Sequence, residues 1–263
     1  MKIFFLGPEG TNSDLAARNI FDDSAKYMPL PSIEDIFEKV AMSHSYYGVI
    51  PFENSYQGVI NSSLNCLIDY DLKILKEFNF SVSHNLCSMN EDVDLSSIKK
   101  ITSHPQVFGQ CNTWIRKNIP DAEKIIATST AEAASETTKD KDLFCIANTY
   151  AIELFGLHTH QKNIQDSNDN KTRFLVIGKS IEDKSEHNKT SVMINIADKP
   201  GSLMSILKPF TELNINMTRI ETRPSRNNQY LHTFFIDFEG YYEDAIVIEL
   251  LEKLENMSEE LRI

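Results

Sequence analysis

Short apolar runs separated by amphipathic stretches fill the first two thirds of the chain. The runs lie at residues 3–6, 47–50, 98–102, 124–127, 144–147 and 174–177. Apolar runs of this length predict strands, and the amphipathic stretches between them predict helices. Because strands that alternate with helices are typical of an α/β architecture, we predict an α/β region over residues 1–178.

The rest of the chain shows two further patterns. Residues 179–189 are almost all polar or charged, which predicts a linker. Beyond them, Val192, Ile194 and Ile196 alternate with other residues as in a strand, and apolar residues between 203 and 210 recur at helical spacing. Two more strands, near 215–217 and 230–238, and a helix near 247–254 follow. With a last strand at 261–263, the order βαββαβ predicts a ferredoxin-like sandwich over residues 190–263.

The length and composition favour a folded protein with two domains. The chain has 263 residues, and 41% of them are hydrophobic, which is enough for two cores. No stretch approaches the roughly 20 apolar residues of a membrane span, and the run at 3–6 meets Gly7 and Pro8 too early for a secretory signal. We therefore predict a cytoplasmic protein without a membrane partner.

Charge and cysteine content limit the ligands that the chain can bind. The net charge is −12, which argues against a nucleic-acid partner and makes an anionic ligand depend on locally concentrated positive groups. The four cysteines, Cys66, Cys87, Cys111 and Cys145, form no CxxC pair and have no histidine at ligand spacing. We predict buried, reduced thiols, no metal site and no organic cofactor.

Polar clusters follow four of the predicted strands. They are 7–13 (GPEGTNS), 51–55 (PFENS), 103–106 (SHPQ) and 128–132 (TSTAE). Each has an ordinary structural explanation by itself: a glycine turn before a capped helix, an exposed loop, a cap by Ser103 or His104, and a capping box of Ser129 and Glu132. Open α/β sheets, however, bind ligands at the carboxyl ends of their strands, and helix N-termini attract anions. The four clusters together therefore predict a ligand site.

A fifth cluster opens the last strand of the α/β region. The sequence Asn170-Lys171-Thr172-Arg173-Phe174 places a hydroxyl, a permanent cation and an aromatic ring side by side. A guanidinium offers a fork of donors to a carboxylate, a hydroxyl can donate to a leaving oxygen, and a ring can cover an apolar substrate face. A strand that starts with an exposed Thr-Arg pair is the structural alternative.

In order and spacing, these motifs resemble the prephenate dehydratase family over essentially the whole chain. Residues 7–13 are similar to GPxGTFS, 51–55 to PIENS, 103–106 to SHPQ, 129–131 to STA, and 163–166 with 170–174 to NIQD and NxTRF. Asn12 replaces an aromatic residue of the family and Phe52 an aliphatic one, and both substitutions bear on the shape of the binding site. The resemblance implies two α/β lobes with the site between them, like a type II periplasmic binding protein.

The resemblance also implies a reaction, in which prephenate loses carbon dioxide and hydroxide so that its ring becomes aromatic. An enzyme for this step must hold a dianion, donate to the departing hydroxyl and exclude water. The resemblance assigns the donor role to Thr172. Around it we place Arg173 on a carboxylate, Phe174 on the ring or in the core, and Glu53 or His104 as a titrating group, each with a structural role as the alternative. The predicted substrate-binding residues are Gly10, Thr11, Ser13, Asn54, Ser55, Ser103, Ser129, Thr130 and Asn170.

The C-terminal domain resembles the ACT regulatory domain of these enzymes. Residues 200–203 (PGSL) are similar to the motif PGAL, and 221–224 (ETRP) to ESRP. The resemblance implies an L-phenylalanine site at a subunit interface, and therefore feedback regulation in a homodimer or homotetramer. The residues that it assigns to this site are Gly201, Ser202, Leu203, Glu221, Thr222 and Arg223. Ser202 and Thr222 replace the family's alanine and serine, and both substitutions bear on effector affinity.

Two other functions fit the same residues. Arogenate dehydratase performs the same elimination on the amino analogue of prephenate, and the sequence does not separate the two. The second alternative is a small-molecule binding or sensing protein without chemistry, although the lack of a secretory signal argues against a receptor for transported solutes. Incubation of purified protein with prephenate distinguishes this alternative from an enzyme.

Overall fold

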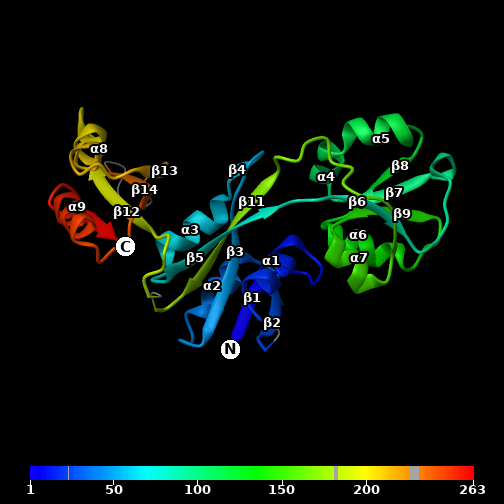
Figure 1. Cartoon of the computed structure of the whole chain (residues 1–263), viewed down its shortest axis with the longest axis horizontal. Helices are drawn as coiled ribbons and strands as arrows, with labels where there is room; N and C mark the ends of the chain where they lie inside the picture. Colours follow the sequence, from blue (N-terminus) through cyan, green and yellow to red (C-terminus); the bar gives the residue numbers. More distant parts are fainter. Residues whose placement is uncertain (23, 181–182, 225–230) are drawn as a thin grey trace. The chain divides into compact units, whose positions relative to one another are not determined.

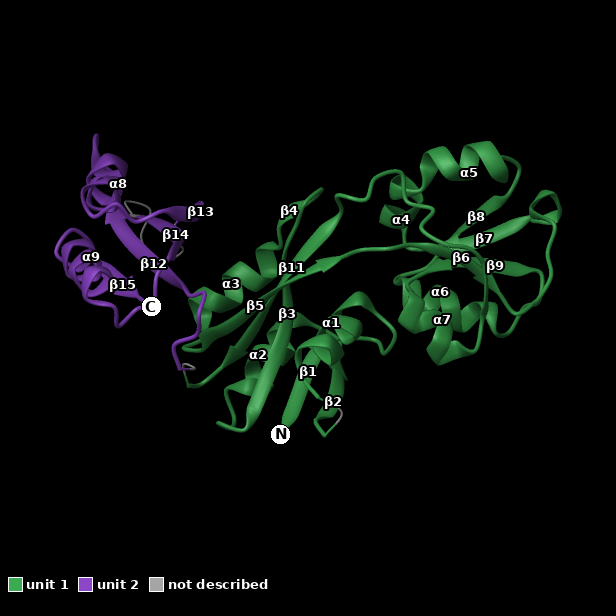
Figure 2. Ribbon diagram, viewed as in Figure 1, with its two compact units in different colours: residues 1–181 green, residues 182–263 purple. Residues whose placement is uncertain are grey.

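The computed structural model describes residues 1–22, 24–180, 183–224 and 231–263 (Figure 1). The chain divides into two compact units, residues 1–181 and 182–263 (Figure 2). The first unit contains two sheets, and the chain passes from the first sheet to the second at 82–84 and returns at 162–170. We call residues 1–81 together with 171–180 the first lobe, and residues 85–161 the second lobe. Residues 181 and 182 of the predicted linker lie outside the described residues.

A mixed sheet forms the centre of the first lobe. The elements of this lobe are β1 (Lys2–Leu6), α1 (Asn12–Ile20), β2 (Lys26–Leu30), α2 (Ile33–Val40), β3 (Tyr46–Asn54), β4 (Gly58–Val59), α3 (Asn61–Asp69), β5 (Lys73–Ser81) and β11 (Lys171–Gly178). The strand order is β2-β1-β3-β11-β5, and β4 pairs with β3. β1 is parallel to β2 and β3, whereas β11 is antiparallel to β3 and β5.

Alternation along β11 divides its side chains between the two faces of this sheet. Phe174 and Val176 lie in the core that the sheet forms with α1. Ile177 lies on the α2 face, where a Cβ atom at Gly48 would come within 2.6 Å of Ile36 and 2.8 Å of Ile177. The missing side chain of Gly48 therefore lets α2 approach the sheet closely. Since successive residues of a strand point to opposite faces, even-numbered residues at the start of β11 face α1 and odd-numbered residues face α2.

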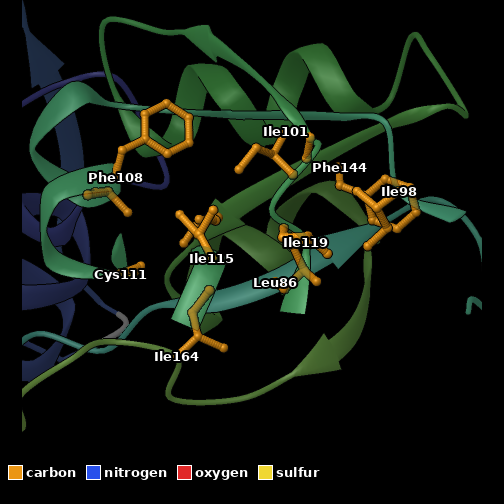
Figure 3. Packing of buried hydrophobic residues seen from close by; sticks show 12 residues of the cluster. Leu86, Ile98, Ile101, Phe108, Cys111, Ile115, Ile119, Phe144 and Ile164 are labelled. Carbon is orange, nitrogen blue, oxygen red and sulfur yellow. The ribbon is translucent and has the colours of Figure 1, made fainter. Parts of the chain in front are cut away.

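The second lobe is a five-stranded sheet with helices on both faces. Its elements are β6 (Asn85–Ser88), η1 (Leu95–Ser97), β7 (Lys100–Ser103), α4 (Pro105–Gln110), α5 (Asn112–Asn118), β8 (Glu123–Ile126), α6 (Thr130–Thr137), β9 (Leu143–Ala147), α7 (Thr149–Phe155) and β10 (His158–Gln161). The strand order is β10-β6-β9-β7-β8. Residues of α4 and α5 pack against one face, with Phe108, Ile115 and Phe144 in one cluster (Figure 3). α6 and α7 cover the other face, whose core includes Cys87 and Cys145.

The prediction of buried, reduced thiols is confirmed. All four cysteines are buried and free. Cys87 and Cys145 lie opposite each other on β6 and β9, with their Sγ atoms 3.2 Å apart. The hydrogen bond with Cys145 and the burial of the thiol raise the pKa of Cys87 well above its usual value. The thiol therefore stays protonated and unreactive at neutral pH.

The second unit has the βαββαβ order that the sequence predicts. Its elements are β12 (Lys189–Ala197), α8 (Ser202–Glu212), β13 (Met217–Pro224), β14 (Leu231–Glu239), α9 (Ala245–Glu255) and β15 (Glu260–Arg262). The strand order is β13-β14-β12-β15, with every neighbouring pair antiparallel. Ile194 and Ile236 share a core with Phe210 of α8 and Leu250 of α9, so both helices cover one face. Tyr230, where the third strand is predicted to begin, lies outside the described residues.

The structure contains strands that the apolar runs did not predict, and β5 is the most important for the site. Its sequence, KILKEFNFS, mixes apolar with polar residues. Antiparallel strands with one solvated face show such alternation instead of a continuous apolar run. The strand predicted at 47–50 also continues to Asn54, so the cluster at 51–55 is not an exposed loop. Phe52 and Asn54 are 3% and 7% exposed. In neither unit do the described residues include a helix long and apolar enough to cross a membrane.

Candidate active site

The ends of β3 and β11 bring three predicted site residues together. Thr172 lies opposite Asn54 in the antiparallel register, and Asn170 precedes it by two positions. The Asn54 Nδ2 atom lies 2.9 Å from Asn170 Oδ1 and 3.0 Å from Thr172 Oγ1. All three side chains are buried, with exposed fractions of 7% for Asn54, 2% for Asn170 and 9% for Thr172. Residues more than 100 positions apart in the sequence thus form one polar cluster.

Hydrogen bonding leaves donors unused in this cluster. The Asn54 amide donates to Thr172 Oγ1, so the threonine oxygen acts as an acceptor. Among the described residues, no acceptor receives the Thr172 hydroxyl hydrogen or the Asn170 amide hydrogens. Donors that the protein itself leaves unpaired remain available to a ligand or to water. The cluster therefore offers donors to a bound oxygen.

Ser55 takes part in the same strand ends but is exposed. Its hydroxyl donates to the Asp169 carbonyl oxygen at 3.1 Å and accepts from the Lys171 N–H at 3.0 Å. These bonds extend the pairing of β3 with β11 beyond Asn54. The structure therefore uses the Ser55 hydroxyl to hold the backbone beside Thr172.

Arg173 lies on the opposite face of β11 from Thr172, because neighbouring strand residues alternate. Its Nε and Nη2 atoms each lie 2.7 Å from Glu77 Oε2, and its guanidinium carbon lies 5.4 Å from the centre of the Phe52 ring. Glu53 is directly opposite Arg173 in the register, so it too faces away from Thr172. The structure thus pairs Arg173 with a carboxylate of the protein, and it does not place Glu53 behind the Thr172 hydroxyl.

Phe174 occupies the core of the first lobe. Its side chain is 1% exposed, and its ring packs edge-on against Phe80 with centroids 6.3 Å apart. This is the core role that the sequence offered as the alternative to contact with a substrate ring.

The loop between β1 and α1 lies at the same edge of the sheet as Asn54, because β1 and β3 are parallel. The Thr11 hydroxyl caps α1 by accepting from the Asp14 N–H at 3.3 Å, and it donates to the Leu6 carbonyl oxygen. The fully buried Asp14 carboxylate accepts from the Gly10 N–H at 2.9 Å and from Arg18 Nε at 2.9 Å. A carboxylate of the protein therefore occupies part of the helix terminus where we predict a substrate carboxylate. The Ser13 hydroxyl has no hydrogen-bond partner in the described part of the chain.

In the second lobe, the predicted site residues serve mainly as caps. The Ser103 hydroxyl, fully buried, donates to the Ile146 carbonyl oxygen at 2.8 Å. His104 caps α4 by accepting from the Gln106 N–H at Nδ1, 3.3 Å away. Ser129 caps α6 by accepting from the Glu132 N–H at 3.0 Å, and Thr130 is the first residue of that helix. The predicted capping box differs in one bond, because the Glu132 carboxylate accepts from the Thr128 N–H instead of the Ser129 N–H.

His84, which the sequence analysis did not single out, joins the two connections between the lobes. Its N–H donates to Gln165 Oε1 at 3.0 Å, and its carbonyl accepts from the Ile164 N–H at 2.9 Å. Its Nε2 atom lies 2.6 Å from Gln110 Oε1. Burial lowers the pKa of His84, and the hydrogen bond to Gln110 partly offsets the shift. The signal in the sequence was the NIQD motif at 163–166, because its residues Ile164 and Gln165 are the two partners of the His84 backbone.

A second contact joins the lobes directly. The Asn148 amide donates to the Gly10 carbonyl oxygen at 3.0 Å and to Asn12 Oδ1 at 2.9 Å. Its own oxygen caps α7 through the Ala151 N–H. A Cβ atom at Gly10 would lie 3.3 Å from the Cβ atom of Ala131, so this glycine lets the loop approach α6. Asn12, which stands where the family has an aromatic residue, thus takes part in a polar contact between the lobes.

The site residues of the second unit are divided between two faces of its sheet. Gly201 has φ +90°, and a Cβ atom there would meet no atom within 4 Å. It precedes Ser202, the first residue of α8, and the exposed Leu203. On β13, Thr222 lies opposite Phe234 and shares the helix-covered face, whereas Glu221 and Arg223 lie on the other face.

Comparisons with known proteins agree with the geometry. A sequence profile of the prephenate dehydratase family matches residues 3–182. Prephenate dehydratase of Methanocaldococcus jannaschii is 36% identical over 260 residues, covering 96% of this chain and 93% of that one. The bifunctional chorismate mutase/prephenate dehydratase of Pseudomonas aeruginosa is 35% identical, covering 97% of this chain and 69% of its own length. The crystal structure of prephenate dehydratase from Arthrobacter aurescens in complex with L-Phe superposes with a TM-score of 0.90 at 27% identity, covering 100% of this chain and 88% of that one. The chain therefore belongs to the prephenate dehydratase family of hydro-lyases.

Proposed function

We propose that the chain carries out the decarboxylating dehydration of prephenate to phenylpyruvate with Thr172 as the donor to the departing hydroxyl. The observation that carries this proposal is the state of the Thr172 hydroxyl. Its oxygen accepts from Asn54, it is buried, and its hydrogen has no acceptor within the described residues. A preorganised donor in a site that excludes water stabilises developing negative charge far more than a donor in bulk water.

The chemistry requires little covalent participation by the protein. Carbon dioxide and hydroxide leave the same ring, and the gain of aromaticity drives both departures. A threonine hydroxyl is too weak an acid to release its proton fully, so Thr172 acts by hydrogen bonding to the oxygen as charge accumulates there. The Asn170 amide, two residues away on the chain, supplies a second donor for the same oxygen or for the nearby carboxylate.

The substrate carboxylates need their own donors. The backbone N–H groups at the start of α1 and the Ser13 hydroxyl lie at the same sheet edge as Thr172. The start of α6, at Ser129 and Thr130, offers a comparable set from the second lobe. Helix N-termini attract anions, and these two sets together suit a dianion. Arg173 is a carboxylate ligand only if it releases Glu77, and otherwise it fixes β11 against β5.

We propose further that residues 190–263 form an ACT domain that binds L-phenylalanine between two copies of the chain. The βαββαβ order, the open left-handed Gly201 and the exposed Leu203 support this proposal, as does the L-Phe complex of the Arthrobacter aurescens relative. The ligand site would include Gly201, Ser202, Leu203, Glu221, Thr222 and Arg223. Binding there would inhibit by favouring a less competent arrangement of the catalytic lobes.

The reaction is tested by incubating purified protein with prephenate and, in parallel, with arogenate. Formation of phenylpyruvate from prephenate supports the proposal, and turnover of arogenate alone assigns the chain to the amino analogue. Binding of prephenate without turnover would leave only the sensing function.

Regulation is tested with Gly201→Val. A β-branched side chain at φ +90° is strained and fills the space beside the start of α8. We expect L-phenylalanine binding, measured by calorimetry, to weaken by about tenfold or more, while uninhibited turnover stays near that of the wild type. Unchanged effector binding by a folded variant would place the effector site elsewhere.

A further inference from the structure

We infer that Asn54 is a positioning residue that fixes the direction of the Thr172 O–H bond, in place of the substrate-binding role predicted from the sequence. This inference rests on the proposed function. The Asn54 amide uses both of its ends within the protein. No part of the side chain is left over for a substrate carboxylate.

The orientation of this amide is fixed by its neighbours. The Asn54 oxygen accepts from the Tyr56 N–H at 3.0 Å and from the Gln57 N–H at 3.3 Å. A flipped amide would place an NH₂ group against these two backbone donors. It would also place the amide oxygen against Asn170 Oδ1. Only one orientation therefore satisfies the network, and it directs the NH₂ group at Asn170 and Thr172.

The orientation of Asn54 determines where the Thr172 proton points. A hydroxyl has one hydrogen and two lone pairs, so an N–H that approaches its oxygen occupies a lone pair and turns the hydrogen away. The NH₂ group also donates to Asn170 Oδ1 at 2.9 Å and to the Lys171 carbonyl oxygen at 3.3 Å, and these contacts hold the nitrogen in place. The branched threonine side chain has few rotamers, which limits the motion of Oγ1 itself. The Thr172 hydroxyl is thus oriented to donate away from Asn54, because the Asn54 NH₂ group occupies one lone pair of its oxygen.

The turn after β3 holds this arrangement. Strands β3 and β4 form a hairpin in which Glu53 pairs with Val59 and Asn54 pairs with Gly58, so that residues 54–58 make the turn. Gly58 has φ +74°, a conformation that L side chains rarely adopt, and no atom lies within 4 Å of a Cβ position there. The turn therefore requires glycine at position 58 because of the backbone conformation there, and not because of packing. The short β3–β4 hairpin delivers the two N–H groups that fix Asn54.

Asn54→Asp tests the inference with almost no change in shape. The carboxylate still accepts from Tyr56 and Gln57, but an oxygen replaces the NH₂ group. That oxygen accepts the Thr172 hydrogen and turns it inward, away from the substrate. We expect kcat for prephenate to fall by about tenfold or more, with KM within about twofold of the wild type.

The pH profile supplies a readout that a purely structural role would not change. The protonated form of a carboxyl group at position 54 regains an O–H donor toward Thr172, whereas the charged form has none. The kcat of Asn54→Asp, relative to the wild type, should therefore rise as the pH falls. Asn19→Asp, on an exposed amide of α1, adds the same charge and serves as the matched control. It should leave both constants and the pH profile unchanged.

A double-mutant cycle decides between positioning and direct binding. In a Thr172→Val background, Asn54→Asp should cause no further loss of kcat, because the hydroxyl that it misdirects is absent. Additive losses, a raised KM with unchanged kcat, or a flat pH profile would each overturn the inference. Absence of prephenate turnover by the wild type would instead reject the proposed function.

Gly58→Ala keeps the inference testable if Asn54→Asp does not fold. This substitution strains the turn and leaves every side chain of the cluster intact. We expect a lower kcat at unchanged KM, and again no further loss in the Thr172→Val background. A full effect of Gly58→Ala in that background would contradict the role of the turn.

Discussion

Polar residues follow strands in both lobes of the first unit, but the two lobes use them differently. In the second lobe, Ser103, His104 and Ser129 each bond to backbone within the lobe. Thr172 of the first lobe and Asn170, the last residue of the connection before β11, accept hydrogen bonds while their own hydrogens stay available among the described residues. Both patterns look alike in the sequence. Counting donors and acceptors separates them, because a helix cap consumes its side chain and a binding site does not.

Caps and anion-binding groups occur in both lobes. Thr11, in the first lobe, is also a cap, and it bonds to both Asp14 and Leu6. Thr130, in the second lobe, begins a helix whose first N–H groups are potential anion donors. The second lobe can therefore bind a carboxylate through backbone groups, while its side chains hold the helices in place. In the proposed function, the first lobe contributes the side-chain donor, Thr172.

Replacement of Thr172 by valine should have the largest effect on activity. Valine keeps the β-branched shape but removes the hydroxyl to which we assign the donor role. We expect kcat at saturating prephenate to fall by roughly a hundredfold or more, with the melting temperature little changed. Near-normal turnover would remove Thr172 from the mechanism and leave Asn170 as the remaining donor.

The second prediction concerns Arg173, whose side chain lies on the face of β11 opposite that of Thr172. If it holds Glu77 and so fixes the strand, Arg173→Lys and Glu77→Gln should both lower kcat/KM by a similar factor, about tenfold, since lysine cannot reproduce the fork of donors. If it binds a substrate carboxylate, Arg173→Lys should raise KM while Glu77→Gln has little effect. Steady-state kinetics of both variants separate these outcomes.

The third prediction tests the caps of the second lobe. Ser129→Ala should lower the free energy of unfolding by about 1 kcal/mol, a shift of roughly 2–4 °C in melting temperature, without affecting kcat. Ser32→Ala is the matched control, because Ser32 caps α2 through the Asp35 N–H in the same way. A raised KM in Ser129→Ala alone would show that this hydroxyl also contacts the substrate.

The order of elements and the residues that meet at the site were predicted to different degrees. Continuous apolar runs correctly located β1, β7, β9 and β11, because buried strands lack polar positions. β5 was missed because its solvated face carries polar residues, and without β5 the partner of Arg173 could not be found. Thr172 and Asn54 were both predicted to be site residues. Their hydrogen bond depends on the register of two strands that are distant in sequence, and no local pattern contains that register.

The side-chain contacts at the junction of the two lobes could also not be predicted from the sequence. His84 lies between two strands that the apolar pattern did not reveal, and it becomes informative only when Gln110 and Gln165 are placed around it. Asn12 was noted as a departure from the family motif. Its contact with Asn148 follows from how the two lobes meet, and Asn148 lies 136 positions further along the chain.

The smallest expected effect concerns pH and the neutral state of His84. Burial lowers its pKa in the folded protein, so below a pH of about 6.5 the unfolded chain binds a proton that the folded chain resists. Stability therefore rises with pH through this window and is lost as the pH falls, by at most about 1.4 kcal/mol per pH unit from this one group.

The variant His84→Gln isolates this contribution. Glutamine can still donate to Gln110 Oε1 but does not titrate, so denaturant unfolding between about pH 7 and 5 should show a shallower loss of stability than in the wild type. His44→Gln, which replaces an exposed histidine of the same unit, is the matched control for the loss of an imidazole. Equal slopes in His84→Gln and the wild type would mean that His84 does not resist protonation, and that the junction of the two lobes tolerates a charge there.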